Sequence, residues 1–147
     1  MVHGRDVWGS IAGNGGDVVY CENNLNEPRI QLLDLYELKL FEGKDPQALL
    51  KATGNAYEKV SFLIQHLKYI SRMRFERYAQ ELLHFQERIQ FVENELPNLP
   101  DDLSVVLPVG CKIRQIAIQQ KNNSIPTYLM NRELWNELDE NQKAALI

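Results

Sequence analysis

Residues that bind transition metals are scarce in this chain. It has two cysteines and three histidines in 147 residues. No Cys-x-x-Cys pair is present, and His3, His66 and His84 do not stand at any spacing that zinc sites use. We therefore expect no metal ion and no cofactor.

Basic charge and long apolar runs are scarce as well. The formal net charge is −4, which argues against a general nucleic-acid-binding surface. No apolar run approaches the roughly 18 residues that a membrane-spanning helix needs. The sequence thus predicts neither nucleic-acid binding nor a membrane span.

Convergent catalytic groups are also missing. The glycines at 13, 15 and 16 precede a predicted strand and no Lys follows them, whereas a phosphate-binding loop follows a strand and carries Gly-Lys-Ser/Thr. Glu81 and His84 have the Glu-x-x-His spacing of di-iron bundles, but no second pair exists, so an exposed histidine is the better interpretation. We expect no catalytic residue in this chain.

What the chain does contain is ordinary globular composition, 44% hydrophobic and 24% charged. We expect a flexible, glycine-rich N-terminal lead over residues 1–16 and a single α+β domain over residues 17–147. Residues 17–21 predict a strand and residues 30–41 a helix that Gly43 ends. Asp45-Pro46 predicts a short helical turn.

Residues 56–96 contain neither Gly nor Pro, and their apolar positions step by three and four, which indicates helix. The step is interrupted between Ile70 and Tyr78. One unbroken helix would be about 60 Å long, too long for a compact domain. The sequence therefore predicts a helical hairpin bent near residues 71–74. The alternative is a single coiled-coil helix with self-association through residues 56–96.

Residues 104–130 predict strands. These are a short strand at 105–107, an alternating strand at 111–119 and a return strand at 127–130, with a hairpin loop at 121–124. Asn131 then caps a short helix. The expected fold class is α+β: a helical hairpin packed on a small antiparallel sheet that strand 17–21 joins, with short C-terminal helices over 131–147.

The last of these helices begins at Asp139, which can cap it together with Gln142. It is too short to be stable alone, and it ends on Ile147 without a Gly, Asn or Pro stop signal. We expect that the present sequence is cut at this point and that the natural chain continues past Ile147.

Cys21 and Cys111 each lie at the edge of a predicted strand, and two interpretations stay open. They are either two buried thiols or one disulfide, which would close a loop of about 90 residues and stabilise the fold by about 4 to 5 kcal/mol. A disulfide would imply an oxidising compartment.

A basic cluster stands close to the predicted bend of the hairpin. A solvated turn is the simpler interpretation of such a cluster, and a binding patch for an anion or a partner is the alternative. Its members are Lys68, Arg72, Arg74 and Arg77.

Several stretches of the sequence carry a resemblance. They are residues 13–21 (GNGGDVVYC) and 32–37 near the start, and residues 106–113, 115–119, 134–138 and 143–147 near the end. Together they resemble an uncharacterised group of secreted or periplasmic proteins from predatory and related bacteria. The resemblance implies export with removal of a signal peptide, a disulfide between Cys21 and Cys111, and a continuation into a His-Glu within the last helix.

A looser resemblance concerns residues 138–146, which are similar to the run before the His-Glu-x-x-His helix of many zinc metallopeptidases. That motif is absent here, so no zinc ligand or catalytic residue transfers to this chain.

These observations favour a secreted or periplasmic binding or structural module without catalysis, with an unknown protein or cell-envelope partner. The alternative is the N-terminal part of a metallopeptidase-like enzyme whose His-Glu helix would follow Ile147.

Overall fold

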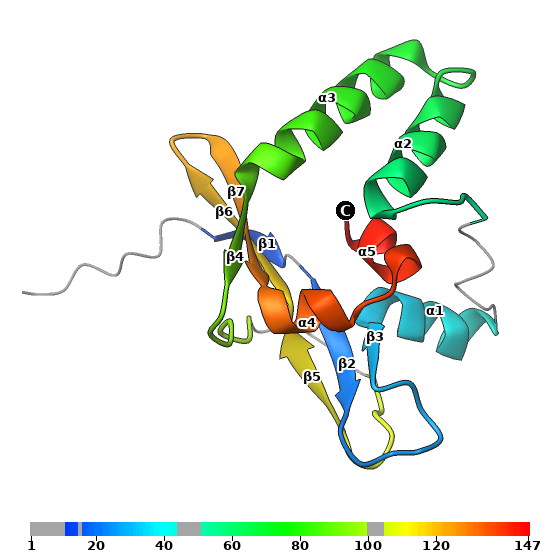
Figure 1. Cartoon of the computed structure of the whole chain (residues 1–147), viewed down its shortest axis with the longest axis vertical. Helices are drawn as coiled ribbons and strands as arrows, with labels where there is room; N and C mark the ends of the chain where they lie inside the picture. Colours follow the sequence, from blue (N-terminus) through cyan, green and yellow to red (C-terminus); the bar gives the residue numbers. More distant parts are fainter. Residues whose placement is uncertain (1–10, 15, 44–50, 100–104) are drawn as a thin grey trace, which may run out of the picture.

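A computed structural model of the chain describes residues 11–14, 16–43, 51–99 and 105–147. Two small sheets form one part of the molecule, and a pair of longer helices extends away from them (Figure 1). The strands are β1 (Ile11–Asn14), β2 (Asp17–Cys21), β3 (Ile30–Leu32), β4 (Ile89–Val92), β5 (Cys111–Gln115), β6 (Ala117–Asn122) and β7 (Ile125–Asn131). The helices are α1 (Leu33–Glu42), α2 (Ala56–Leu67), α3 (Arg72–Arg88), α4 (Arg132–Glu137) and α5 (Glu140–Leu146).

The first sheet is antiparallel, with the strand order β3-β2-β5. Its central strand β2 is the predicted strand at residues 17–21, and all five of its residues are buried. β-Branched side chains such as Val18 and Val19 suit a strand that is covered on both faces. The expected joining of this strand to a later one is confirmed, since β2 pairs with β5 in a register that places Cys21 opposite Cys111.

The second sheet has the order β1-β6-β7-β4 and is mixed, because β4 runs parallel to β7. The predicted single strand at 111–119 is interrupted at Ile116, where the chain passes from the first sheet to the second. Gln115 supplies hydrogen bonds to backbone carbonyl groups at this passage. Its Nε2 donates to the carbonyls of Gly16 and Ala117 at 2.8 and 2.7 Å.

Two segments that were expected to be helical are strands. Residues 30–32 form β3 on the edge of β2, so the helix begins only at Leu33. Residues 89–92 form β4, so the second arm of the hairpin ends at Arg88. In both cases the apolar residues suit either structure locally, and pairing with another strand, β2 for β3 and β7 for β4, decides between them.

Three further expectations were wrong or lie outside the described residues. Residues 11–14, expected in the flexible lead, pair with β6 as β1. Residues 105–107 form no strand. The turn at Asp45-Pro46 and most of the predicted lead lie outside the described residues.

The predicted helical hairpin is confirmed, and the alternative of one continuous coiled-coil helix is wrong. Asn55 caps α2 in a capping box with Glu58, and Ser71 caps α3 by accepting a hydrogen bond from the backbone N–H of Arg74. The two arms meet at residues 68–71 and diverge toward the sheets, so that they form an open V (Figure 1). No helix among the described residues is long and apolar enough to cross a membrane.

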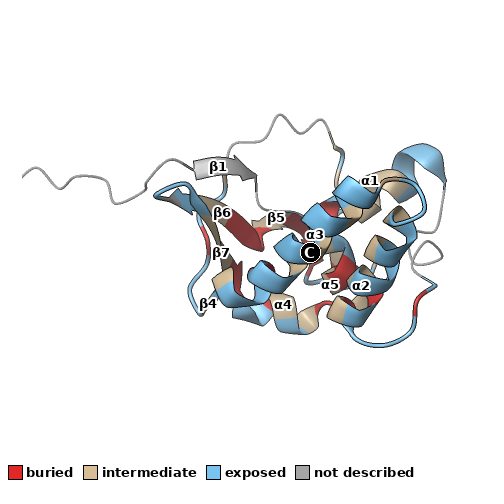
Figure 2. Ribbon diagram, turned by 90° about the horizontal axis from the view of Figure 1, so that it is seen from above, coloured by how far each residue is buried: buried red, intermediate tan, exposed pale blue. Residues whose placement is uncertain are grey.

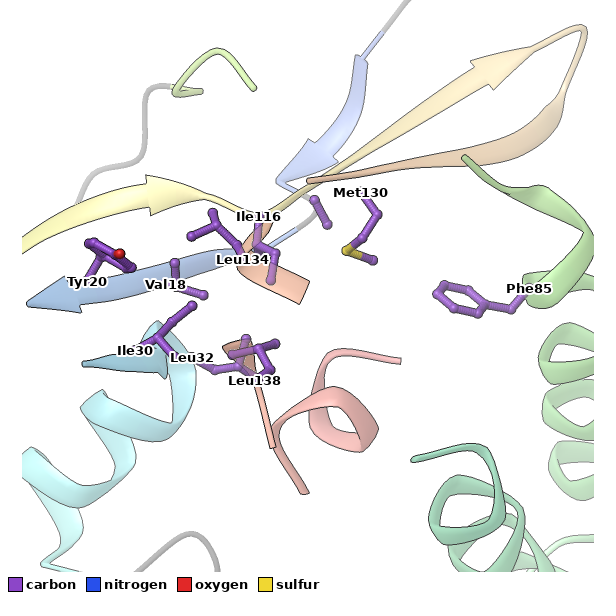
Figure 3. Packing of buried hydrophobic residues seen from close by; sticks show 10 residues of the cluster. Val18, Tyr20, Ile30, Leu32, Phe85, Ile116, Met130, Leu134 and Leu138 are labelled. Carbon is purple, nitrogen blue, oxygen red and sulfur yellow. The ribbon is translucent and has the colours of Figure 1, made fainter. Parts of the chain in front are cut away.

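The hydrophobic core lies where the two sheets meet α4 and α5. Ile116, Met130 and Leu134 are almost completely buried there. Figure 3 shows Met130 between Ile116 and Phe85, so the core reaches from the sheets to the base of α3. Buried residues lie mainly on the strands, whereas the outer surfaces of α2 and α3 are exposed or intermediate (Figure 2). The hairpin is therefore only partly covered by the rest of the fold.

Helix α5 begins as predicted, because Asp139 Oδ1 accepts a hydrogen bond from the backbone N–H of Gln142 at 2.8 Å. Two side chains then fix its place. Gln142 Oε1 accepts from the backbone N–H of Leu32 at 2.9 Å and so covers the free edge of β3. Glu140 Oε2 accepts from the backbone N–H of Ala56 at 2.7 Å, at the first turn of α2. Hydrogen bonds from Lys143 and Ala56 lower the pKa of Glu140.

Candidate functional site

The structure joins Cys21 and Cys111 in a disulfide. The two residues are directly opposite on β2 and β5, with their Cα atoms 4.1 Å apart. Cys21 is buried beside Val19 and Leu33 in a small cluster of its own. The bond thus links two neighbouring strands of the first sheet that are 90 residues apart in the sequence. Its buried position is that of a structural disulfide.

An apolar hollow lies inside the V of the hairpin, and we call it the hairpin groove. It has a volume of about 320 Å³. One face of each arm lines it, because the apolar residues recur at helical spacing. From α2 come Val60, Leu63, Ile64 and Leu67; from α3 come Tyr78, Glu81, Leu82 and Phe85; Tyr128 of β7 and Ile147 complete it.

Aromatic packing forms the base of the hairpin groove. Phe85 is buried, and its ring centroid lies 4.9 Å from that of Tyr128 and 6.3 Å from that of Tyr57. A second hollow of about 130 Å³ adjoins this base and reaches Met130 in the core. Phe85, Tyr128 and Ile147 border both hollows, so the apolar space continues from the hairpin to the second sheet.

The walls of the hairpin groove remain in contact with water. Leu63 and Tyr78 are each about half exposed, although they lie on the apolar faces of their helices. Half-exposed apolar side chains that face one another across a hollow leave hydrophobic surface uncovered, and such surface marks binding sites.

One polar corner breaks the apolar lining. Glu81 is the charged residue among those that line the hairpin groove, and its Oε2 lies 3.6 Å from an Nη atom of Arg88. Burial, followed by the negative charge of Glu81, raises the pKa of Tyr128, and Arg88 opposes this effect. The Tyr128 hydroxyl therefore stays neutral at physiological pH and can donate or accept a hydrogen bond.

The four residues of the predicted basic cluster lie together at the closed end of the hairpin. Arg72 pairs with Glu76 at 2.9 Å, and the Lys68 Nζ lies 6.0 Å from the centre of the Phe75 ring. Within the described part of the chain, Arg74 and Arg77 make no ion pair. The cluster is therefore only partly neutralised.

The Glu81–His84 pair does not form a metal site. The ring nitrogen Nδ1 of His84 lies 3.4 Å from Glu87, while Glu81 faces Arg88. His84 is about half exposed, as the sequence indicated. Over the described residues, no group of three or more His, Cys, Asp or Glu side chains is placed to hold a metal ion.

The sequence did not reveal the hairpin groove. Its apolar stripes were recognised, but they were assigned to a hairpin packed on the sheet. Tyr128 and Ile147 are distant in sequence from both helices, and no motif marks them. The available signal was the apolar stripe on each arm, which needs a partner surface to cover it.

Comparison with known proteins adds no relative: no family model, no curated protein and no solved structure matches this chain.

Proposed function

We propose that this protein is a non-catalytic binding module of the periplasm or the extracellular space, and that it holds the apolar part of a small amphiphile in the hairpin groove. The single observation that carries this proposal is the groove itself, a hollow lined by apolar side chains from α2, α3 and β7 that remains open to water.

The size of the hairpin groove favours a small molecule. Its volume of about 320 Å³ lies at the lower end of the range of roughly 300 to 1,000 Å³ that is typical of small-molecule pockets. A second hollow of about 130 Å³ extends it toward the core. Filling this space with an apolar chain removes hydrophobic surface from water on both partners, which contributes roughly 25 cal/mol per Å².

The polar corner supports an amphiphile in place of a purely apolar ligand. Glu81, Arg88 and the Tyr128 hydroxyl offer a carboxylate, a guanidinium and a neutral hydroxyl at one side of the groove. A ligand whose polar end reaches this corner keeps its hydrogen bonds while its apolar part replaces water.

The disulfide supports the proposed location in the periplasm or the extracellular space. Disulfides persist in oxidising surroundings such as the periplasm and the extracellular space, and they are rare in the cytosol. The bond between Cys21 and Cys111 closes a separation of 90 residues, so its loss would matter to the fold.

Titration with a dansyl-labelled medium-chain fatty acid tests the binding site. Leu63→Asp places a charge in the hairpin groove, whereas the matched change Leu83→Asp places one in another hollow of the hairpin, of about 480 Å³, which Leu63 does not line. We expect Leu63→Asp to weaken binding at least about tenfold, equivalent to 1.4 kcal/mol, and Leu83→Asp to leave it unchanged.

Circular dichroism verifies that both variants keep the helical content of the parent. Equal affinities for the parent, Leu63→Asp and Leu83→Asp would contradict the proposal, as would the absence of binding by the parent protein.

A further inference from the structure

The turn between the two arms of the hairpin carries apolar side chains that the fold does not use. We call residues 68–74 the hairpin tip. Tyr69, Ile70 and Met73 are 90%, 77% and 78% exposed. Turns on a protein surface are normally polar, so three large apolar side chains within five positions form an exposed patch that requires an explanation.

The hairpin tip is a well-defined structure. The backbone N–H of Ile70 and that of Ser71 both donate to the carbonyl of Leu67, at 3.0 and 2.7 Å. Ser71 then caps α3. These bonds fix the backbone of the turn, which forms a convex end of the molecule at the far end of the hairpin from the sheets (Figure 1).

Positive charge surrounds this apolar end. The segment 67–78 has four basic residues and one acidic residue, in a chain whose net charge is −4. Its acidic residue, Glu76, pairs with Arg72. Lys68, Arg74 and Arg77 make no ion pair with any carboxylate of the described chain. The local charge is therefore positive, opposite in sign to the net charge of the whole protein, and it complements an anionic surface.

We propose that the hairpin tip docks on an anionic lipid bilayer. Ile70 and Met73 enter the boundary between headgroups and acyl chains, the Tyr69 ring lies at headgroup level, and the basic residues contact the anionic headgroups. Apolar residues beside Lys and Arg are the combination that holds peripheral proteins at such surfaces. The convex shape of the tip suits a deformable bilayer better than a protein partner, which would need a matching concave surface.

The proposed membrane contact uses residues that do not line the hairpin groove, so it can be tested independently of the proposed ligand. The two features are compatible, because Leu67, the residue before the tip, lines the groove. An amphiphile that leaves a membrane would therefore meet the open groove close to the docking point.

Flotation with lipid vesicles at low ionic strength tests the docking surface. We expect the parent protein to float with vesicles of phosphatidylcholine and phosphatidylglycerol, and not with phosphatidylcholine alone. Ile70→Ser is expected to lower the apparent affinity at least about fivefold. The matched control Val109→Ser removes an apolar side chain that is 92% exposed in the turn before β5, and it is expected to bind like the parent.

A double variant, Arg74→Gln with Arg77→Gln, tests the charged part and is also expected to lower the affinity at least about fivefold, since basic residues are attracted to anionic headgroups. No flotation of the parent would overturn the proposal, and so would equal binding by Ile70→Ser and Val109→Ser. Loss of binding in the arginine variant alone, with Ile70→Ser binding like the parent, would show that charge without apolar insertion holds the protein at the vesicles, and it would overturn the proposed docking of the apolar tip.

Discussion

At the scale of single residues, buried amide side chains do much of the work of joining the elements. Gln115 bonds carbonyls where the chain passes between the sheets, and Gln142 hydrogen-bonds the edge of β3 through both of its amide atoms. Asn131 caps α4 and also donates to the carbonyl of Asn94. In a chain with small sheets and short helices, such bonds satisfy backbone groups that regular ladders leave open.

Gln142→Ala should therefore be costly. The N–H of Leu32 would remain buried without its acceptor, and an unsatisfied buried donor costs about 1 to 3 kcal/mol. We expect the free energy of unfolding in urea to fall by about 2 kcal/mol. Gln80→Ala, on an exposed position of α3, is the control and should change it by less than about 0.5 kcal/mol. Equal effects of the two substitutions would show that the Gln142 hydrogen bond contributes nothing.

At the scale of elements, two boundaries show where local preference yields to pairing. Residues 30–32 and 89–92 continue the apolar patterns of the helices beside them, yet both are strands. β3 gains hydrogen bonds from β2, and β4 gains them from β7. β7, the partner of β4, is distant from it in sequence, so the periodicity of residues 56–96 alone predicted a second arm that was too long.

The hairpin between β6 and β7 turns through Asn123 and Ser124, whose φ values are 49° and 69°. Two consecutive positive φ angles define the turn that favours Asn-Gly, because the second position suits a residue without a Cβ atom. We expect Ser124→Gly to raise the free energy of unfolding by about 0.5 kcal/mol.

The same substitution elsewhere supplies the control for Ser124→Gly. Ser61 is an exposed residue in the middle of α2. Ser61→Gly should lower the free energy of unfolding by about 0.5 kcal/mol, since glycine disfavours helix. Urea unfolding of the two variants should give shifts of opposite sign. Shifts of the same sign would contradict the role assigned to the turn.

At the scale of the whole molecule, the disulfide and α5 link parts that are distant in sequence. Cys21 and Cys111 lock β2 against β5, while α5 contacts β3 through Gln142 and α2 through Glu140. The outer faces of α2 and α3 are exposed (Figure 2). Most of the buried residues lie in the sheets and the short helices α4 and α5, and the hairpin groove lies at the margin of this core.

Removing the disulfide should reveal how strongly it constrains the unfolded chain. For a separation of 90 residues, Cys21→Ala with Cys111→Ala is expected to lower the free energy of unfolding by about 4 kcal/mol. Reductant should destabilise the parent and leave the double variant unchanged. The unfolded parent should also resist thiol labelling until it is reduced, and labelling of both cysteines without reductant would contradict the bond.

By itself, the sequence determined the local features of this protein: the apolar stripes of the two arms, the caps at Asn131 and Asp139, and the strand at residues 17–21. Each depends on neighbours within about one or two turns of chain, whose spacing is visible in the sequence. Only the tertiary structure decided which strands pair, where the chain changes sheet at Ile116, and that Tyr128 and Ile147 meet the hairpin. Those contacts join residues far apart in the chain, and no local pattern encodes the partner that a distant strand or helix supplies.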